Sequence, residues 1–296
     1  MTATAARPVR VPLPPGFDFS WALGFLAART VASLESVEDG VYRRSVRLNG
    51  KPVILTLRES RTGSNASPAI VATSTPQLPP RELRAIVTRM LDLDADVDRF
   101  HRLARRDPIL GAIVRRRSGI RLPQLLDPFE GLTRGVLGQQ VSVAGASTLV
   151  DRLVRLVSAP PLAARNSLLA FPTAGTVAEI GEERLRTIGL TRARAATMIG
   201  VARRIAEGAL DLEALRGAPA DHAQAALEEL PGIGPWTASY VRMRALGDRD
   251  AFPAADLGVI KAMAAAGVER RAIAEVAERW KPWRGYATLH LWASLS

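Results

Sequence analysis

The sequence predicts an α+β protein that is mostly helical, with a small antiparallel sheet near its N-terminus. Strand-like residues occur only within the first hundred positions, where Asn49-Gly50 separates two β-rich runs. From about Asp98 onward, apolar residues recur at helical spacing and Gly or Pro interrupts the pattern. The chain has no cysteine, so it must fold around buried cores and not around a disulfide scaffold.

The N-terminal part is expected to alternate helices and strands. The expected elements are a helix over residues 19–33 with Ser20 as N-cap, strands over 41–48, 52–59 and 69–73, and a helix over 80–91. Asn-Gly between the first two strands strongly favours a two-residue hairpin turn. We therefore expect residues 1–97 to form an α/β domain.

Aspartates occupy every second position at the end of this domain: Asp92, Asp94, Asp96 and Asp98. A calcium-binding loop would need Gly at its sixth position and Glu at its twelfth, where this chain has Val97 and Leu103. The better interpretation is a solvated helix start.

Composition limits the function classes. The 40 Lys and Arg residues exceed the 29 Asp and Glu residues, which gives a net charge of +11 and favours nucleic acid as the partner. No apolar run reaches the roughly 18 residues of a membrane helix, and the N-terminus lacks the core of a secretory signal. Without cysteine and with 3 histidines, an iron–sulfur cluster or a multi-histidine metal site is not expected. We expect a monomeric cytoplasmic protein without a membrane partner.

Residues 221–246 hold the most informative motif. Pro231, Gly232 and Gly234 predict a tight hairpin between two helices, and Pro235 suits the first position of the second helix. Glycine amides and a helix N-terminus that point the same way form a binding site for a phosphate. An ordinary corner between two helices is the alternative interpretation.

The stretch LPGIGPWTA resembles the hairpin of the helix–hairpin–helix/Gly-Pro-Asp DNA glycosylases. In that family a Gly/Pro-rich loop with an essential Asp follows the hairpin, and here Asp256 lies 22 residues after Gly234. The closer resemblance, over nearly the whole chain, is to the AlkA-type bacterial 3-methyladenine DNA glycosylases. The matching stretches are residues 20–29, 137–144, 171–173, 280–284 and 289–292.

This resemblance implies a fold and a domain organisation. The N-terminal domain, residues 1–97, would have a TATA-binding-protein-like antiparallel topology. Residues 98–296 would form a helical glycosylase domain of two subdomains, about 126–244 and 98–125 plus 245–296, with the active-site cleft between them.

The resemblance also implies a catalytic carboxylate at Asp256. Cleavage of the bond between base and deoxyribose passes through an oxocarbenium-like transition state, which a nearby carboxylate stabilises. An N-cap for the following helix is the alternative role for Asp256, and both roles can hold together. Bifunctional relatives carry a Lys two residues after the second hairpin Gly, where this chain has Trp236. An indole cannot form a Schiff base, so we expect a monofunctional enzyme that leaves an abasic site.

A flipped base needs a pocket with aromatic faces, and alkylated cationic bases are attracted to electron-rich rings. By resemblance the pocket residues are Trp236, Tyr240 and Trp292, with Phe25 and Arg29 closing it. Each aromatic residue alone would more often belong to a core, and Arg29 could equally form a surface salt bridge.

The remaining expected site residues contact DNA or an ion. Gly232, Gly234 and Thr237 would hold a phosphate. In the 138–142 loop, Gln139 and Gln140 occupy the region where the family inserts an apolar wedge, and Gln140 replaces its Leu. Leu257 and Pro235 depart from the family's usual residues as well. By resemblance, the carbonyls of Glu228, Leu230 and Ile233 would hold a structural monovalent cation; no other cofactor is expected.

The expected function is therefore excision of alkylated bases, of the 3-methyladenine and 7-methylguanine class, from duplex DNA in base excision repair. The expected location is the bacterial cytoplasm, at the nucleoid. Two alternatives stay open: a non-catalytic helix–hairpin–helix DNA-binding protein, and a glycosylase for oxidised or deaminated bases. The order of preference among alkylated bases, hypoxanthine and ethenoadenine is also open.

Overall fold

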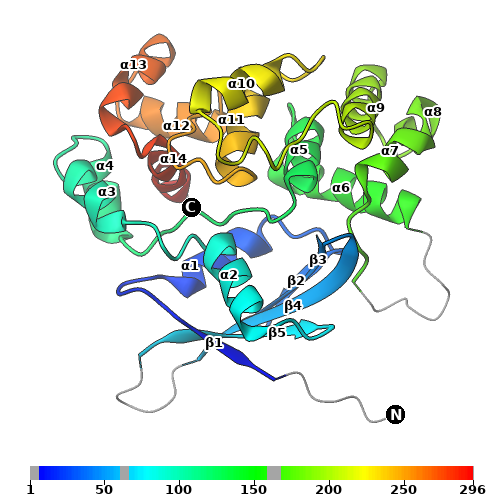
Figure 1. Cartoon of the computed structure of the whole chain (residues 1–296). Helices are drawn as coiled ribbons and strands as arrows, with labels where there is room; N and C mark the ends of the chain where they lie inside the picture. The colour runs from blue at the N-terminus through cyan, green and yellow to red at the C-terminus, as the bar shows by residue number, and fades with distance from the viewer. Residues whose placement is uncertain (1–6, 61–66, 159–167, 296) are drawn as a thin grey trace.

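The computed structural model describes residues 7–60, 67–158 and 168–295, which form a sheet with helices packed above it (Figure 1). The sheet is antiparallel, with strand order β1-β5-β4-β3-β2. Its strands are β1 Val9–Pro12, β2 Glu35–Glu38, β3 Val41–Leu48, β4 Lys51–Ser60 and β5 Ala69–Thr75. Asn49 and Gly50 both have positive φ, of 48° and 75°, so the expected hairpin turn is confirmed.

Two helices, α1 Phe19–Ala27 and α2 Pro80–Met90, pack with the sheet. The core between these helices and the sheet contains Leu55, Leu57 and Leu83, all buried. The expected N-cap was wrong: Asp18, not Ser20, has the extended backbone of a cap, and its Oδ1 accepts from the Trp21 N–H at 2.8 Å. The first helix also ends at Ala27, well short of residue 33, because tight turns lead the chain directly into β2.

The rest of the described chain is helical. Its helices are α3 Val97–Ala104, α4 Leu110–Arg116, α5 Pro128–Leu137, α6 Val143–Val157, α7 Ala174–Ile180, α8 Glu182–Arg186, α9 Arg192–Ala206, α10 Ala220–Glu228, α11 Pro235–Arg244, α12 Leu257–Ala265, α13 Ile273–Ala277 and α14 Arg284–Ala293. The expected α+β, mostly helical class is therefore confirmed. None of the described helices is long and apolar enough to cross a membrane.

The buried apolar side chains of the helical part form two clusters. One is built mainly on α5, α6, α9 and α11 and includes Leu132 and Val241. The other is built mainly on α3, α4, α12 and α14 and includes Phe100 and Tyr286. The boundaries expected near residues 97, 125 and 244 remain a prediction about how the chain divides into domains.

The aspartates at the end of α2 do not all lie in solvent. Asp96 is exposed and caps α3, as expected of a helix start. Asp92 is buried, so the expectation of a solvated side chain was wrong there. Its carboxylate accepts hydrogen bonds from Arg249 and from the Tyr286 hydroxyl, at 2.7 and 2.6 Å. Asp92 therefore ties the N-terminal part to the C-terminal helices.

Candidate active site

A cleft of about 1250 Å³ lies where α1, α6, α11, α12 and α14 meet. Among the described residues, the large apolar side chains that are exposed are those of Val141, Val143, Leu257 and Leu295. All of them line this cleft. Exposed apolar groups that gather at one place mark an interaction surface.

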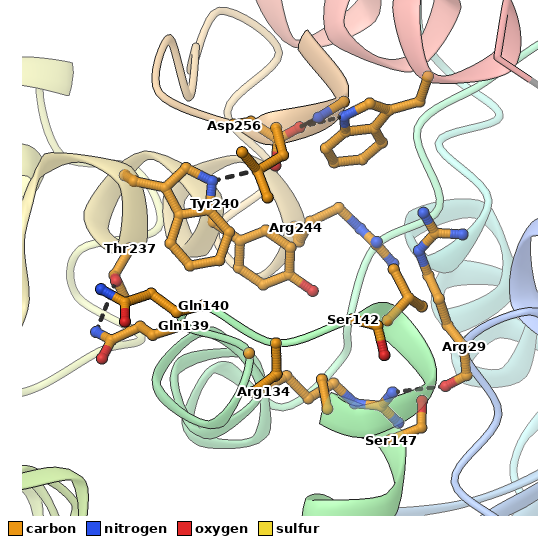
Figure 2. Close-up of a pocket in the computed structure, with 18 of the residues that line it drawn as sticks. Arg29, Arg134, Gln139, Gln140, Ser142, Ser147, Thr237, Tyr240, Arg244 and Asp256 are labelled. Atoms are coloured by element: carbon orange, nitrogen blue, oxygen red, sulfur yellow. Dashed lines mark hydrogen bonds between the residues drawn. The ribbon is translucent and has the colours of Figure 1, made fainter. Parts of the chain in front are cut away.

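Asp256 caps α12 and faces the cleft (Figure 2). Its Oδ1 accepts from the backbone N–H groups of Gly258 and Val259, at 2.9 and 3.1 Å. The structure therefore gives Asp256 the cap geometry that the sequence suggested as one of two roles. Its second oxygen is left for groups in the cleft.

Both tryptophans expected in the pocket donate to this carboxylate. The indole Nε1 of Trp292 lies 2.8 Å from Oδ1, and that of Trp236 lies 3.1 Å from Oδ2. Gly258 makes the first contact possible, because a Cβ there would lie 2.7 Å from a ring carbon of Trp292. A carboxylate held by four N–H donors suits its ionised form, which only accepts hydrogen bonds.

The other expected pocket side chains extend the aromatic wall. Tyr240 stacks on Trp236 with ring centroids 5.6 Å apart, as i, i+4 neighbours on α11 do. Phe25 stacks on Trp292 at 6.4 Å, but it is buried behind that ring and does not line the cleft. Arg29 does line it: its Cζ lies 3.7 Å from the Phe25 ring centroid, so the guanidinium rests on an aromatic face.

Sequence reasoning missed Arg244. It lines the same cleft and is 3% exposed. Trp236, Tyr240 and Arg244 are spaced i, i+4 and i+8 along α11, so helical periodicity places all three on one face. This spacing was the signal by which the sequence could have placed Arg244 at the cleft. The guanidinium Nε of Arg244 donates to the Pro123 carbonyl at 2.8 Å.

A buried charge network lies beside the cleft and was also missed. Glu35 of β2 and Arg44 of β3 pair with each other, and Glu130 and Arg134 of α5 complete the set. Burial alone would raise the pKa of Glu35, but Arg134 and Arg44 hold it below its ordinary value. Such residues resemble ordinary surface charges in a sequence, because their partners are up to 99 positions away.

The hairpin between α10 and α11 has the expected form, with Pro235 at the first turn of α11. Gly232 has a φ of 84°, and a Cβ there would lie 2.0 Å from the Thr197 hydroxyl of α9. Gly234 has open space around it. Gly232 is therefore required by the fold, whereas Gly234 leaves the hairpin surface accessible.

The 138–142 loop is joined to this hairpin. The side-chain amide of Gln139 donates to the Gly232 carbonyl at 2.9 Å and to the Thr237 hydroxyl at 3.0 Å. Thr237 is buried, so it supports the hairpin from within. Gln140 is exposed with a φ of 55°, and it projects from the loop at the cleft.

The expected cation site stays a prediction. The Leu230 carbonyl already accepts from the Ile233 N–H at 3.0 Å within the turn, which leaves one lone pair for an ion. Glu228 ends α10, so its carbonyl lies at the helix terminus. Among the described residues, no group of His, Asp and Glu side chains could hold a metal ion.

Comparison with known proteins gives two family matches. The model described as "AlkA N-terminal domain" matches residues 8–127, and that described as "HhH-GPD superfamily base excision DNA repair protein" matches residues 133–284. A Mycobacterium tuberculosis protein named "probable bifunctional transcriptional activator/DNA repair enzyme AlkA" is 38% identical over 99% of this chain, which spans 57% of that protein. "DNA-3-methyladenine glycosylase 2" of Escherichia coli is 34% identical, with 94% of each chain covered.

Two solved DNA glycosylase structures have a fold similar to that of this chain. A 3-methyladenine DNA-glycosylase from Archaeoglobus fulgidus is 26% identical, with a TM-score of 0.78 over 96% of each chain. An 8-oxoguanine glycosylase/lyase of Clostridium acetobutylicum, solved with double-stranded DNA, has a TM-score of 0.74 over 99% of this chain and 98% of its own. At 19% identity it shares the fold alone.

Proposed function

The chain belongs to the HhH-GPD superfamily of base excision DNA repair proteins, as its hairpin and Asp256 suggested, and on that premise we propose that it is a monofunctional DNA glycosylase. It excises alkylated bases of the 3-methyladenine and 7-methylguanine class from duplex DNA and leaves an abasic site. The observation that carries the proposal is the Asp256 carboxylate, held by two indole N–H groups inside the cleft.

The geometry suits stabilisation of a cation. A base flipped into the cleft would lie against the Trp236–Tyr240 stack, with its deoxyribose near Asp256. As the bond to the base breaks, positive charge develops on the sugar, and the fixed carboxylate stabilises it without reorganisation. Water then adds to the sugar, with Asp256 accepting its proton.

Monofunctional chemistry is supported by Trp236, which replaces the amine that a lyase would need. The fold does not decide this question, since it is shared with a glycosylase/lyase. Lys261 lines the cleft and is the amine to test. Borohydride should trap no covalent adduct on lesion DNA; an adduct that disappears in Lys261→Ala would make the enzyme a lyase.

We propose that the hairpin and the rim of the cleft contact the DNA. Gly234 and the N-terminus of α11 would bind a phosphate, and Gln140 with Val141 would fill the space left by the flipped base. A monovalent cation on the carbonyls of Glu228, Leu230 and Ile233 would orient the hairpin. We propose that the protein acts as a cytoplasmic monomer on double-stranded DNA.

Base release from duplexes that each carry one lesion tests the proposal. We expect release of 3-methyladenine and 7-methylguanine, with the strand left intact until alkali is added. Binding to every duplex without release would identify a non-catalytic DNA-binding protein. Release of 8-oxoguanine with no release of either methylated base would assign the enzyme to oxidised lesions.

A further inference from the structure

Exposed arginines gather around the ends of α3 and α4. Residues 102–117 hold six arginines and one acid, so six positive charges less one negative give this short segment +5 of the chain's net charge of +11. All six side chains are exposed. We use the name arginine surface for this set: Arg102, Arg105, Arg106, Arg115, Arg116 and Arg117.

The one acid of the segment does not neutralise the arginine surface. Asp107 is buried, and its Oδ1 accepts from the N–H groups of Ile109 and Leu110, both at 2.9 Å. Its Oδ2 accepts from the Trp280 indole at 2.9 Å and pairs with Arg279 at 2.6 Å. Within residues 7–60, 67–158 and 168–295, no carboxylate forms an ion pair with any of the six arginines.

The positive charges lie close to one another. A Cβ on Gly111 of α4 would lie 3.3 Å from Nη1 of Arg115 and 3.0 Å from the Arg105 carbonyl oxygen. The Arg115 guanidinium therefore lies beside the turn from which Arg105 and Arg106 project. Exposed like charges repel within a Debye length, which is roughly 8 Å at physiological salt. The arrangement therefore opposes the folded state unless a partner supplies negative charge.

The helix ends and the need for solubility do not explain this concentration of charge. A helix C-terminus carries about half a negative charge, which favours nearby cations. Here each of the two C-termini has three arginines around it, at positions 102, 105 and 106 for α3 and 115, 116 and 117 for α4. Solubility depends on net charge, and dispersed arginines would supply it with less repulsion. The arginine surface therefore fits an external polyanion.

The arginine surface continues the cleft. Arg117 lines a second cavity, of about 610 Å³, together with Arg29 and Trp292, and these two residues also line the cleft. The second cavity thus adjoins the cleft at the Arg29 side chain. Figure 2 shows Arg29 on one side of the cleft and Thr237, with Gln139, on the other side. Since Gln139 is bonded to the hairpin, the arginine surface lies on the side of the cleft away from the hairpin.

We infer that the arginine surface is a second DNA-binding surface, which binds the phosphate backbone of duplex DNA on the side of the cleft away from the hairpin. Duplex DNA carries about one negative charge per 1.7 Å of its axis, so clustered cations can neutralise several phosphates at once. Phosphate contacts carry no sequence information. The surface therefore holds undamaged and damaged duplexes alike. The inference goes beyond the proposed function, because no step of base release depends on it.

The test removes three of these charges together, by Arg105→Gln, Arg106→Gln and Arg115→Gln in one protein. Affinity for an undamaged duplex is measured by fluorescence anisotropy over a range of salt concentrations. The slope of log K against log salt should become less steep by about 2–3, because each phosphate contact contributes about 0.9. Affinity at physiological salt should fall about tenfold or more. The melting temperature should stay equal or rise, because repulsion within the surface is relieved.

The matched control combines Arg58→Gln, Arg81→Gln and Arg84→Gln. These arginines are exposed on β4 and α2, lie outside the cleft and remove the same charge, so the slope should change by less than about 1. Arg115→Gln alone should lower the slope by about 1, and it serves if the first triple variant does not fold.

An unchanged slope in the arginine-surface variants, or an equal change in the control, overturns the inference. A lower melting temperature with unchanged affinity also overturns it, because the arginines would then support the fold. Since the probe is undamaged DNA, the result does not depend on base release. Failure of the proposed glycosylase function and failure of this inference are therefore separate outcomes.

Discussion

The Asp256 carboxylate is at once a helix cap and the proposed catalytic group, and a single substitution separates the two roles. Asp256→Asn should lower base release by several powers of ten, or about 3–5 kcal/mol, because the negative charge is lost. Asn is an equally good cap, and only its contact with the Trp236 indole would be lost, so stability should change by about 1 kcal/mol or less.

Single-turnover kinetics and thermal unfolding of the same preparation check both statements. Binding to an abasic duplex should survive, since removing a carboxylate also removes repulsion with DNA. An Asn variant that retains wild-type release would show that Asp256 only caps α12.

The sequence allowed the position of motif residues to be expected, but not the contacts between distant residues. By resemblance to the family, Trp236 and Asp256 were expected at one cleft, and both line it. Arg44 and Glu130 lie 86 positions apart, and nothing local distinguishes them from surface charges. Phe25 was expected to close the pocket together with Arg29. Its depth behind Trp292 could not be predicted, because it depends on how the two distant helices α1 and α14 pack.

A substitution in the hairpin between α10 and α11 tests whether this element binds DNA. Gly232 is not a suitable position for the substitution, since any side chain would strain its positive φ and collide with Thr197. Gly234→Asp adds a negative charge in open space at the proposed phosphate site. We expect affinity for duplex DNA to fall about tenfold or more at fixed salt, measured by fluorescence anisotropy, with unfolding unchanged.

Gly217→Asp is the matched control. Gly217 also has open space, is exposed and lies outside the cleft, so this variant carries the same charge change. Equal affinity of the two variants would remove the hairpin from the DNA interface.

The cap of α5 predicts a pH dependence of stability. Burial, with Glu130 adding repulsion, raises the pKa of Asp127 from 3.8 to about 6. Between these values the folded protein binds a proton that the unfolded chain has lost, so this group destabilises the fold as the pH rises through that window. Asp127→Asn keeps the cap, and it should stabilise the protein above pH 6 by up to about 3 kcal/mol.

Urea unfolding at pH 7.5 and pH 4.5 measures this effect, and the gain should shrink at the lower pH. Asp96→Asn, at the exposed cap of α3, should change stability by no more than about 0.5 kcal/mol. A less stable Asp127→Asn protein at pH 7.5 would contradict the prediction.

The elements themselves were predicted unevenly. The 41–48 and 52–59 strands carry alternation and a turn signal, and they were found. The edge strands β1 and β2 have 4 residues each, too few to show a period of two. Their strand conformation comes from pairing with β5 and β3, which is information that lies elsewhere in the chain.

Across the whole molecule, the sheet and the helical part meet at the buried charge network beside the cleft. Arg44 comes from β3 and Glu130 from α5, and their side chains are 3% and 1% exposed. With Glu35 and Arg134 the network holds two positive and two negative charges. Its charge balance therefore couples the N-terminal sheet to α5, whose Arg134 lines the cleft.

This balance predicts non-additive mutations. Arg44→Met leaves two buried carboxylates on one guanidinium, and Glu130→Met leaves two guanidinium groups on one carboxylate. Each should cost about 3–5 kcal/mol in urea unfolding, because an uncompensated charge stays buried. The double variant retains one pair, Glu35 with Arg134, and should be more stable than either single variant.

The exposed Arg271–Glu269 pair is the control. Arg271→Met and Glu269→Met should each cost no more than about 1 kcal/mol, and their effects on the free energy of unfolding should be additive. Additive losses at Arg44 and Glu130 would show that the sheet and the helical part are not coupled through these charges.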